Sequence, residues 1–197
     1  MKATAWIHQH VERHLAPGDR VVDATAGNGH DTLFLARQVG LSGRVAAFDI
    51  QQEAIENTRM RLEAAGLLAS VLLIHASHER MLEHLPTDWS GTVKAVIFNL
   101  GYLPNGDHAL VTRPASTLAA MCHALELLAN GGVLAAVLYH GHPGGREEMA
   151  AVLDWVAGLD TGHYHVELPP RMVNEAPQPL LVFKGKRVTC LDECGRL

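Results

Sequence analysis

Short apolar runs alternate along the chain with segments whose apolar residues recur every three or four positions. The runs are rich in Val, Ala, Leu and Ile, which is typical of buried strands, and the three-to-four spacing is typical of helices packed on one side. This alternation predicts βαβ units arranged around a parallel sheet. We expect the strands of these units at residues 20–25, 44–49, 70–75, 93–99 and 133–139.

Helical periodicity fills the intervals between these strands. Ile7, Val11 and Leu15 share one face of an opening helix, which Pro17 and Gly18 are expected to end. Further helices are expected after residue 29, between residues 51 and 66, from about 114 to 128, and around 149–156.

The pattern in the last part of the chain predicts the final strands of the sheet. Gly131 and Gly132 are expected to turn the chain into the fifth strand, and runs near 163–168 and 180–184 are expected to form a closing hairpin. The predicted fold is α/β, a doubly wound, seven-stranded, mostly parallel, Rossmann-like sheet. Right-handed crossovers then bring the loops after the first four strands to one edge. We expect a single domain over residues 1–197, with an N-terminal helix in 1–16 and a short tail in 185–197.

Composition and charge narrow the class of protein. The chain has 197 residues, of which 48% are hydrophobic, and this is enough for one domain with its own core. We find no apolar run of the roughly 18 residues that a membrane span needs and no apolar signal-peptide core, so we expect a cytoplasmic protein with no membrane partner. Three cysteines are too few for a disulfide framework. A net charge of −5 argues against broad nucleic-acid binding but permits a local basic patch, or a dimer that builds one.

The strongest local motif is VVDATAGNGHDT at residues 21–32. A strand delivers Asp23, and a Gly-Asn-Gly turn at residues 27–29 leads into a helix, so that backbone N–H groups can approach a ligand closely. A dinucleotide fingerprint would place a third glycine where Thr32 stands. The missing glycine, together with Asp23 and Asp31, favours a positively charged adenosine ligand without pyrophosphate. S-adenosylmethionine has this chemistry, which predicts a class I methyltransferase.

Two later loops agree with this interpretation. Asp49 ends the second strand, 22 residues after Gly27, which is the spacing at which a carboxylate accepts hydrogen bonds from ribose hydroxyls. Ser77 and His78 follow the third strand, where the adenine edge would lie. Taken alone, a GxG segment is a plain turn and Asp49 is a helix cap, but three agreeing loops favour a cofactor site. The predicted cofactor-binding residues are Asp23, Ala26, Gly27, Asn28, Gly29, Asp31, Thr32, Asp49, Gln51, Ser77, His78 and Asn99.

The fourth strand runs into the segment FNLGYLP at residues 98–104. This segment resembles the Asn-Pro-Pro-Tyr loop of amino-group methyltransferases, in which the Asn oxygen and a backbone carbonyl accept hydrogen bonds from the target amine and an aromatic ring stacks on the base. Leu100 and Gly101 replace the two prolines here. A protonated amine has no lone pair, so a general base is also expected. The predicted catalytic residues are Asn99, Tyr102, Asp107, His140 and His142.

Residues 139–145, YHGHPGG, follow the fifth strand and are too rich in glycine and proline to begin a helix. Two histidines spaced by two residues need a third ligand to hold a metal ion, and we find no compact set that supplies one, so no metal site is predicted. We expect this segment to contact substrate. The predicted substrate-binding residues are Leu100, Gly101, Tyr102, Arg113, Tyr139 and His140.

These motifs together resemble a small bacterial family long labelled "putative rRNA methylase". The resemblance rests on DATAGNGHDTLFLA, AFDIQ, FNLGYLPNGD and YHGHPGG, and it runs in register from about residue 17 to residue 184. It implies an enzyme of tRNA modification. The reaction it implies is methylation of the amine of 5-aminomethyl-(2-thio)uridine at the wobble position, giving 5-methylaminomethyl-(2-thio)uridine. It also implies a homodimer that binds the tRNA anticodon loop.

Three alternatives remain open. The first is a methyltransferase that acts on another RNA base or on a small-molecule amine. The second is a nicotinamide-dependent Rossmann oxidoreductase, which the missing third glycine and the lack of a Tyr-x-x-x-Lys pair after the fourth strand disfavour. The third is a non-catalytic RNA-binding or adenosine-sensing module, which the presence of both a cofactor loop and a catalytic loop disfavours. Basic residues available to an RNA partner are Arg113, Arg146, Arg171, Lys184, Lys186 and Arg187.

Overall fold

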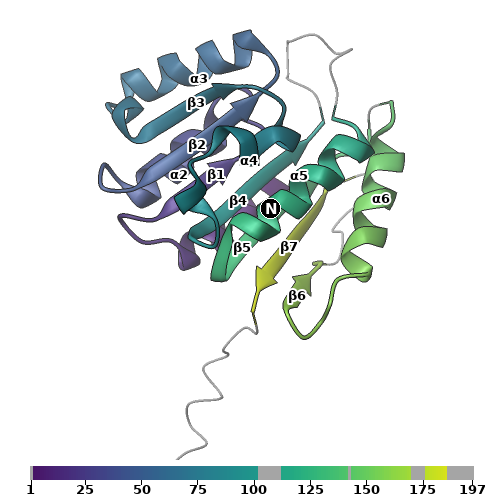
Figure 1. Ribbon diagram of the computed structural model, residues 1–197. Coiled ribbons are helices and arrows are strands. Elements are labelled where there is room, and N and C mark those ends of the chain that lie inside the picture. Colours follow the sequence, from purple (N-terminus) through teal and green to yellow (C-terminus); the bar gives the residue numbers. More distant parts are fainter. Residues whose placement is uncertain (1, 102–111, 142, 170–175, 186–197) are drawn as a thin grey trace, which may run out of the picture.

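A seven-stranded sheet with helices on both faces forms the protein in the computed structural model, which describes residues 2–101, 112–141, 143–169 and 176–185 (Figure 1). The strand order is β3-β2-β1-β4-β5-β7-β6. The first five strands pair in parallel, and β7 pairs antiparallel with both β5 and β6. The doubly wound sheet predicted from the sequence is therefore confirmed. The strands are β1 (Arg20–Asp23), β2 (Arg44–Asp49), β3 (Val71–His75), β4 (Val93–Leu100), β5 (Leu128–Leu138), β6 (Tyr164–Glu167) and β7 (Gln178–Lys184).

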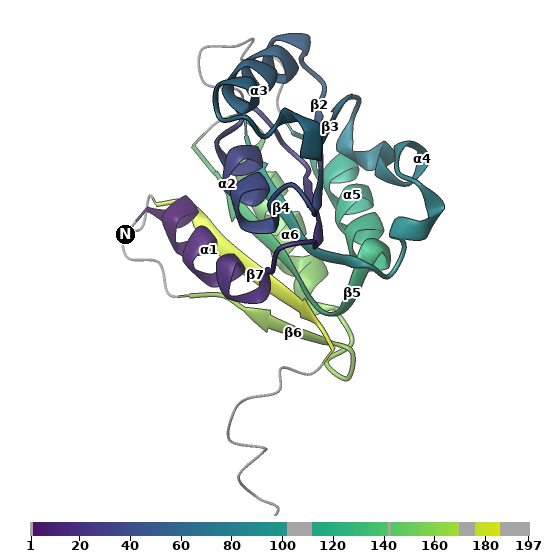
Figure 2. The same cartoon turned by 90° about the vertical axis from the view of Figure 1, so that its left-hand side faces the viewer.

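Two apolar clusters lie on the two faces of this sheet, because successive side chains along a strand point to opposite sides. Val21 of β1 belongs to the cluster beneath α1, α2 and α3, and its neighbour Val22 belongs to the cluster beneath α4, α5 and α6. Figure 2 shows these two layers of helices on either side of the sheet. The helices are α1 (Ala3–Val11), α2 (His30–Val39), α3 (Gln52–Ala64), α4 (Met81–His84), α5 (Pro114–Leu127) and α6 (Gly145–Ala157).

The helices lie where the periodicity predicted them, with three differences. Helix α6 begins at Gly145, so the prediction that residues 139–145 do not begin a helix is wrong at its last residue, where Gly144 with a φ of 81° caps the helix. The opening helix ends at Val11 and continues as a 3-10 turn over Glu12–His14, so Leu15 lies beyond it. The short helix α4 was not predicted, since four residues are too few to show a helical period. Among the described residues, the structure has no helix with the length and apolarity needed to cross a lipid bilayer.

The predicted turn at Gly131 and Gly132 is wrong, because both glycines lie inside β5, which begins directly after α5. Gly131 has a positive φ of 78°, and the pairing register of β4 and β5 shifts between Val93 and Ala95. A Cβ on Gly132 would lie 2.9 Å from the Val93 carbonyl oxygen. The glycine pair therefore accommodates a β-bulge and a close backbone approach.

Candidate functional site

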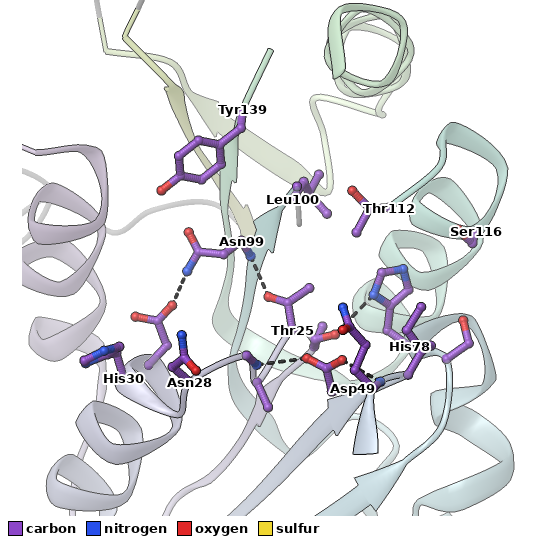
Figure 3. Close-up of a pocket in the computed structure, with 18 of the residues that line it drawn as sticks. Thr25, Asn28, His30, Asp49, His78, Asn99, Leu100, Thr112, Ser116 and Tyr139 are labelled. Carbon is purple, nitrogen blue, oxygen red and sulfur yellow. Dashed lines mark hydrogen bonds between the residues drawn. The ribbon is translucent and has the colours of Figure 1, made fainter. Parts of the chain in front are cut away.

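A cavity of about 620 Å³ opens at the carboxyl edge of the parallel strands (Figure 3). This volume is within the range of pockets that hold small molecules. The loops after β1 to β4 line it, as predicted from the crossovers. Tyr139 and Gly141 after β5 and Thr4 of α1 add to its wall. The predicted site residues that line the cavity are Ala26, Gly27, Asn28, Asp31, Asp49, Gln51, Ser77, His78, Asn99, Leu100, Gly101 and Tyr139.

Other predicted residues lie elsewhere. Asp23, Gly29 and Thr32 are buried behind the cavity wall. Arg113 and His140 lie next in sequence to the wall residues Thr112, Tyr139 and Gly141 without lining the cavity themselves. The predictions for Tyr102, Asp107 and His142 lie outside the described residues.

Asp23 stabilises the loop after β1 by hydrogen bonds. Its carboxylate accepts hydrogen bonds from the Thr32 hydroxyl at 2.6 Å and from the Thr25 N–H at 3.1 Å. Burial raises the pKa of Asp23 to about 7, and the negative charge of the nearby Asp31 adds to this effect. The side chain therefore braces the turn of the loop, whereas Asp31 reaches the cavity.

The raised pKa predicts that Asp23 makes the fold less stable as pH rises. Between the ordinary pKa of 3.8 and about 7, the unfolded carboxyl loses its proton while the native one keeps it. The native state then binds more protons, so the free energy of unfolding falls with pH, by at most about 1.4 kcal/mol per pH unit for this group. Asp23→Asn is expected to remove this contribution, measured by urea unfolding at pH values from 4.5 to 7.5. Asp154→Asn, at an exposed position of α6, is the matched control, and an unchanged slope in Asp23→Asn would contradict the prediction.

Helix α3 packs against the Gly-Asn-Gly turn at residues 27–29. Gly29 caps α2 with a φ of 76°, and a Cβ at this position would lie 2.8 Å from the Cα of Thr58. Thr58 also donates a hydrogen bond from its hydroxyl to the Gly27 carbonyl, at 3.2 Å. The turn is therefore packed closely from behind, which leaves its other side to line the cavity.

This packing predicts a measurable cost for Gly29→Ala. The substitution combines the strain of a positive φ with a backbone clash, and we expect it to lower the free energy of unfolding by about 2–4 kcal/mol. Gly40→Ala is the matched control, because Gly40 lies at the other end of α2 with a φ of 64° and has no atom within 4 Å of the added Cβ. Equal losses of stability in thermal unfolding would show that the clash with Thr58 contributes nothing.

Asp49 joins the first two loops. Its Oδ2 accepts a hydrogen bond from the Gly27 N–H, and its Oδ1 accepts one from the Gln51 N–H, each at 2.9 Å. Burial raises the pKa of Asp49, and the two backbone donors oppose this rise. Each carboxylate oxygen keeps a further lone pair, and the side chain lines the cavity, so Asp49 is suited to accept hydrogen bonds from two neighbouring hydroxyls.

His78 follows β3 in the chain, and its ring lies 5.8 Å from the ring of Phe98 in β4, measured between the centroids. Its Nδ1 lies 3.1 Å from the Ala24 carbonyl, which can only accept, so this nitrogen holds the proton. Burial lowers the pKa of His78, which keeps the ring neutral and leaves Nε2 as an acceptor. Ile50 has an exposed apolar side chain that lines the same cavity. A flat ring with an N–H donor at its edge fits these two neighbours.

Asn99 stands at the end of β4, between Thr25 and Tyr139 (Figure 3). Its backbone N–H donates to the Thr25 hydroxyl at 2.7 Å, and its side-chain amide donates to Asp31. Its Oδ1 is buried and has no hydrogen-bond partner within the described part of the chain. A buried acceptor without a donor costs free energy, so a hydrogen bond from an added N–H group to this atom would be favourable.

Several contacts around the cavity were not predicted from the sequence. Asp31 also meets His8 of α1, with 2.5 Å between Oδ1 and Nε2. Thr112 donates from its N–H to the Gly101 carbonyl at 3.1 Å and from its hydroxyl to the buried Glu148 at 2.7 Å. No sequence motif marks these pairs, since their partners are 11 or more positions apart and meet only through the fold.

The charge of the described wall is negative. Asp31 and Asp49 both face the cavity, and the described lining contains no lysine or arginine. Such a wall favours a ligand with positive charge. Over the described ranges, no group of three or more His, Cys, Asp or Glu side chains has the arrangement of a metal site.

Comparison with known proteins agrees with this geometry. Residues 45–184 match the family described as "Putative rRNA methylase". The chain is 40% identical to a chloroplastic tRNA (mnm(5)s(2)U34)-methyltransferase of Arabidopsis thaliana, over 94% of this chain and 70% of that protein. It is also similar to a putative rRNA-methylase structure from Clostridium thermocellum, with 40% identity, a TM-score of 0.88, and coverage of 93% of this chain and 98% of that one. A putative methyltransferase from Streptococcus mutans, solved in complex with SAH, is 35% identical with a TM-score of 0.81 and the same coverage.

Proposed function

The chain belongs to the putative rRNA methylase family of S-adenosylmethionine-dependent methyltransferases, and from this membership we propose that it methylates an amine on the wobble uridine of tRNA. The proposed substrate is 5-aminomethyl-(2-thio)uridine, and the proposed product is its 5-methylaminomethyl form. The printed name of the Arabidopsis thaliana relative supports this choice of nucleoside.

The observation that carries the proposal is the buried, unpartnered Oδ1 of Asn99. Because Asp31 holds the NH2 group of the same amide, the oxygen is turned away from Asp31 and keeps its acceptor capacity beside the cavity that Asn99 lines. An amine that donates one N–H to this oxygen has its lone pair directed by the bond. Alignment of this kind is the main work of the protein in a displacement at an activated methyl group.

The cavity fits the methyl donor at three points. The packed turn before α2 gives a ligand close access to backbone, Asp49 offers two oxygens for ribose hydroxyls, and His78 offers Nε2 to an N–H donor at the adenine edge. Bound S-adenosylmethionine supplies a methyl group activated by a sulfonium. We propose that the residues around it hold the donor, exclude water and aim the amine.

The amine nitrogen forms a bond to the methyl carbon while the carbon–sulfur bond breaks, and that electron pair stays on sulfur. Before this step the alkylammonium has to release one proton. Asp107, His140 and His142 are retained as proposed bases. His140 lies in the chain between the wall residues Tyr139 and Gly141, which is the reason for keeping it among the proposed bases.

The acceptor side also has an aromatic surface. Tyr139, at the end of β5, lines the cavity beside Asn99 and remains 37% exposed (Figure 3). An exposed aromatic ring next to the acceptor atom is suited to stack on an unpaired base from a loop. We therefore propose the tRNA anticodon loop as the partner, with Tyr139, Leu100, Gly101 and Arg113 on the substrate side and Tyr102 as a second aromatic.

A homodimer in the cytoplasm completes the proposal. The net charge of −5 makes a lone chain a poor electrostatic partner for RNA. A second copy would widen any basic surface that contains Arg113 and Arg146. Lys184, which the sequence also suggested for this surface, donates from its ammonium to the Leu125 and Leu128 carbonyls at the opposite edge of the sheet.

The test is a methylation assay on purified protein. S-adenosylmethionine and tRNA that carries 5-aminomethyluridine at the wobble position are incubated with the protein, and the digested nucleosides are analysed by mass spectrometry. We expect a gain of one methyl on that nucleoside and none on tRNA without the aminomethyl group. Binding of S-adenosylhomocysteine without any gain would reject this acceptor and direct the search to other RNA bases and small amines.

A further inference from the structure

The helix α1 reaches the edge of the sheet where the cavity opens. Its buried residues Ile7 and Val11 pack in the same cluster as residues of β5 and β7, which fixes the helix on that face (Figure 2). Thr4 and His8 are one helical turn apart and so share a side of the helix. Thr4 lines the cavity, and His8 contacts Asp31.

The His8 ring is fixed by two contacts. Its Nε2 lies 2.5 Å from Oδ1 of Asp31, and its face stacks on Phe34 of α2 with 3.9 Å between the ring centroids and 4° between the planes. An ionised carboxylate only accepts hydrogen bonds, so Nε2 holds the proton that lies between them. The stacking sets the plane of the ring, and the hydrogen bond sets its direction within that plane.

Asp31 links the fixed His8 ring to the side chain of Asn99 through hydrogen bonds. One of its oxygens accepts from His8 and the other accepts from Nδ2 of Asn99, so the carboxylate cannot rotate without losing a bond. The same acceptor-only chemistry requires the NH2 group of Asn99 to face Asp31, which turns Oδ1 to the opposite side. Asp31 is buried with a relative exposure of 5%, so water replaces a lost partner poorly.

We propose that His8 is a positioning residue that holds the Asn99 amide in its productive orientation through Asp31. The inference rests on the proposed function, in which Oδ1 of Asn99 accepts a hydrogen bond from the target amine. It makes α1 part of the active site, although His8 itself does not line the cavity. A misplaced amide lowers the rate of transfer by up to about 100-fold, because alignment dominates this reaction.

The kinetic test compares three variants. In His8→Ala we expect kcat to fall about 10-fold to 100-fold, with the KM for S-adenosylmethionine and the Kd for S-adenosylhomocysteine changed less than about threefold. His8→Gln keeps an N–H donor and is expected to recover a large part of the lost kcat. His10→Ala is the matched control, because His10 lies on the same helix and also stacks on an aromatic ring, that of Trp6, away from Asp31. Equal losses of kcat in His8→Ala and His10→Ala would overturn the proposal.

A second readout does not depend on the acceptor. The side-chain amide signals of Asn99 are assigned in 15N-labelled protein by their loss in Asn99→Ala. In His8→Ala these signals are expected to shift and to exchange with water faster, while His8→Gln and His10→Ala keep the wild-type signals. Unchanged signals in His8→Ala would overturn the proposal. Shifted signals together with no methylation of the tRNA by the wild-type protein would support the role of His8 and reject the proposed acceptor.

Discussion

Asn99→Ala is expected to lose about 100-fold to 1,000-fold in kcat while it still binds S-adenosylhomocysteine. Removal of one pre-oriented hydrogen-bonding group at a reacting centre has costs of this size. The amide oxygen is the buried acceptor that the cavity leaves without a partner among the described residues, so its loss removes the group that aims the amine. The backbone N–H of residue 99 still bonds to Thr25, which preserves the end of β4.

The measurement is single-turnover methylation together with calorimetric titration of S-adenosylhomocysteine. Asn130→Ala is the matched control, because Asn130 is an exposed asparagine on β5, away from the cavity lining. Full turnover in Asn99→Ala would exclude the role of this side chain in aiming the amine. A parallel loss of cofactor affinity would instead assign the side chain to the cofactor.

Asp49→Ala is expected to weaken the binding of S-adenosylhomocysteine by at least about 100-fold. Hydrogen bonds to a charged acceptor contribute about 1.5–3 kcal/mol each, and two ribose hydroxyls would donate to this carboxylate. The same substitution also releases the N–H groups of Gly27 and Gln51, which loosens the loop that lines the cavity. Turnover at saturating S-adenosylmethionine is expected to fall less than affinity.

Two further variants separate the effect of the Asp49 charge on cofactor binding from its effect on the structure of the loop. Asp49→Asn keeps an oxygen that accepts one of the two backbone N–H groups and loses the bond to the other, so it is expected to lose affinity with a smaller loss of thermal stability than Asp49→Ala. Asp154→Ala, on the exposed side of α6, is the control for the loss of a carboxylate in general. Wild-type affinity in Asp49→Ala would mean that the carboxylate only braces the loop, as a helix-capping role would require.

The sequence predicted those parts of the site that depend on local pattern and topology. Asp49 and Asn99 end strands, and parallel strands bring their carboxyl ends to one edge, so alternation of strands and helices was enough to place both. The Gly-Asn-Gly turn has its own local signal. The family resemblance added the reaction, which no spacing could indicate.

Contacts between distant elements could not be predicted in this way. His8 of α1 meets Asp31 of α2 across 23 positions, and Thr112, just before α5, meets Glu148 of α6 across 36 positions. Each pair depends on how distant elements pack. The glycine pair in β5 shows a different limit. Gly-Gly is typical of turns, but here the close approach of β4 determines the need for glycine, and a sequence does not show which backbone comes near.

The place of β7 in the sheet has a consequence for how the chain matures during translation. The ribosome makes α1 and β5 well before residues 178–184, yet α1 packs on a face that β5 and β7 build together. Until β7 emerges and pairs with β5, one side of that strand lacks its partner and α1 lacks part of its support. We therefore expect nascent chains that stop short of β7 to bind chaperones and to lack the His8 contact with Asp31. Activity would then appear as a late, all-or-none event of synthesis, detectable on ribosome-bound chains of stepwise increasing length.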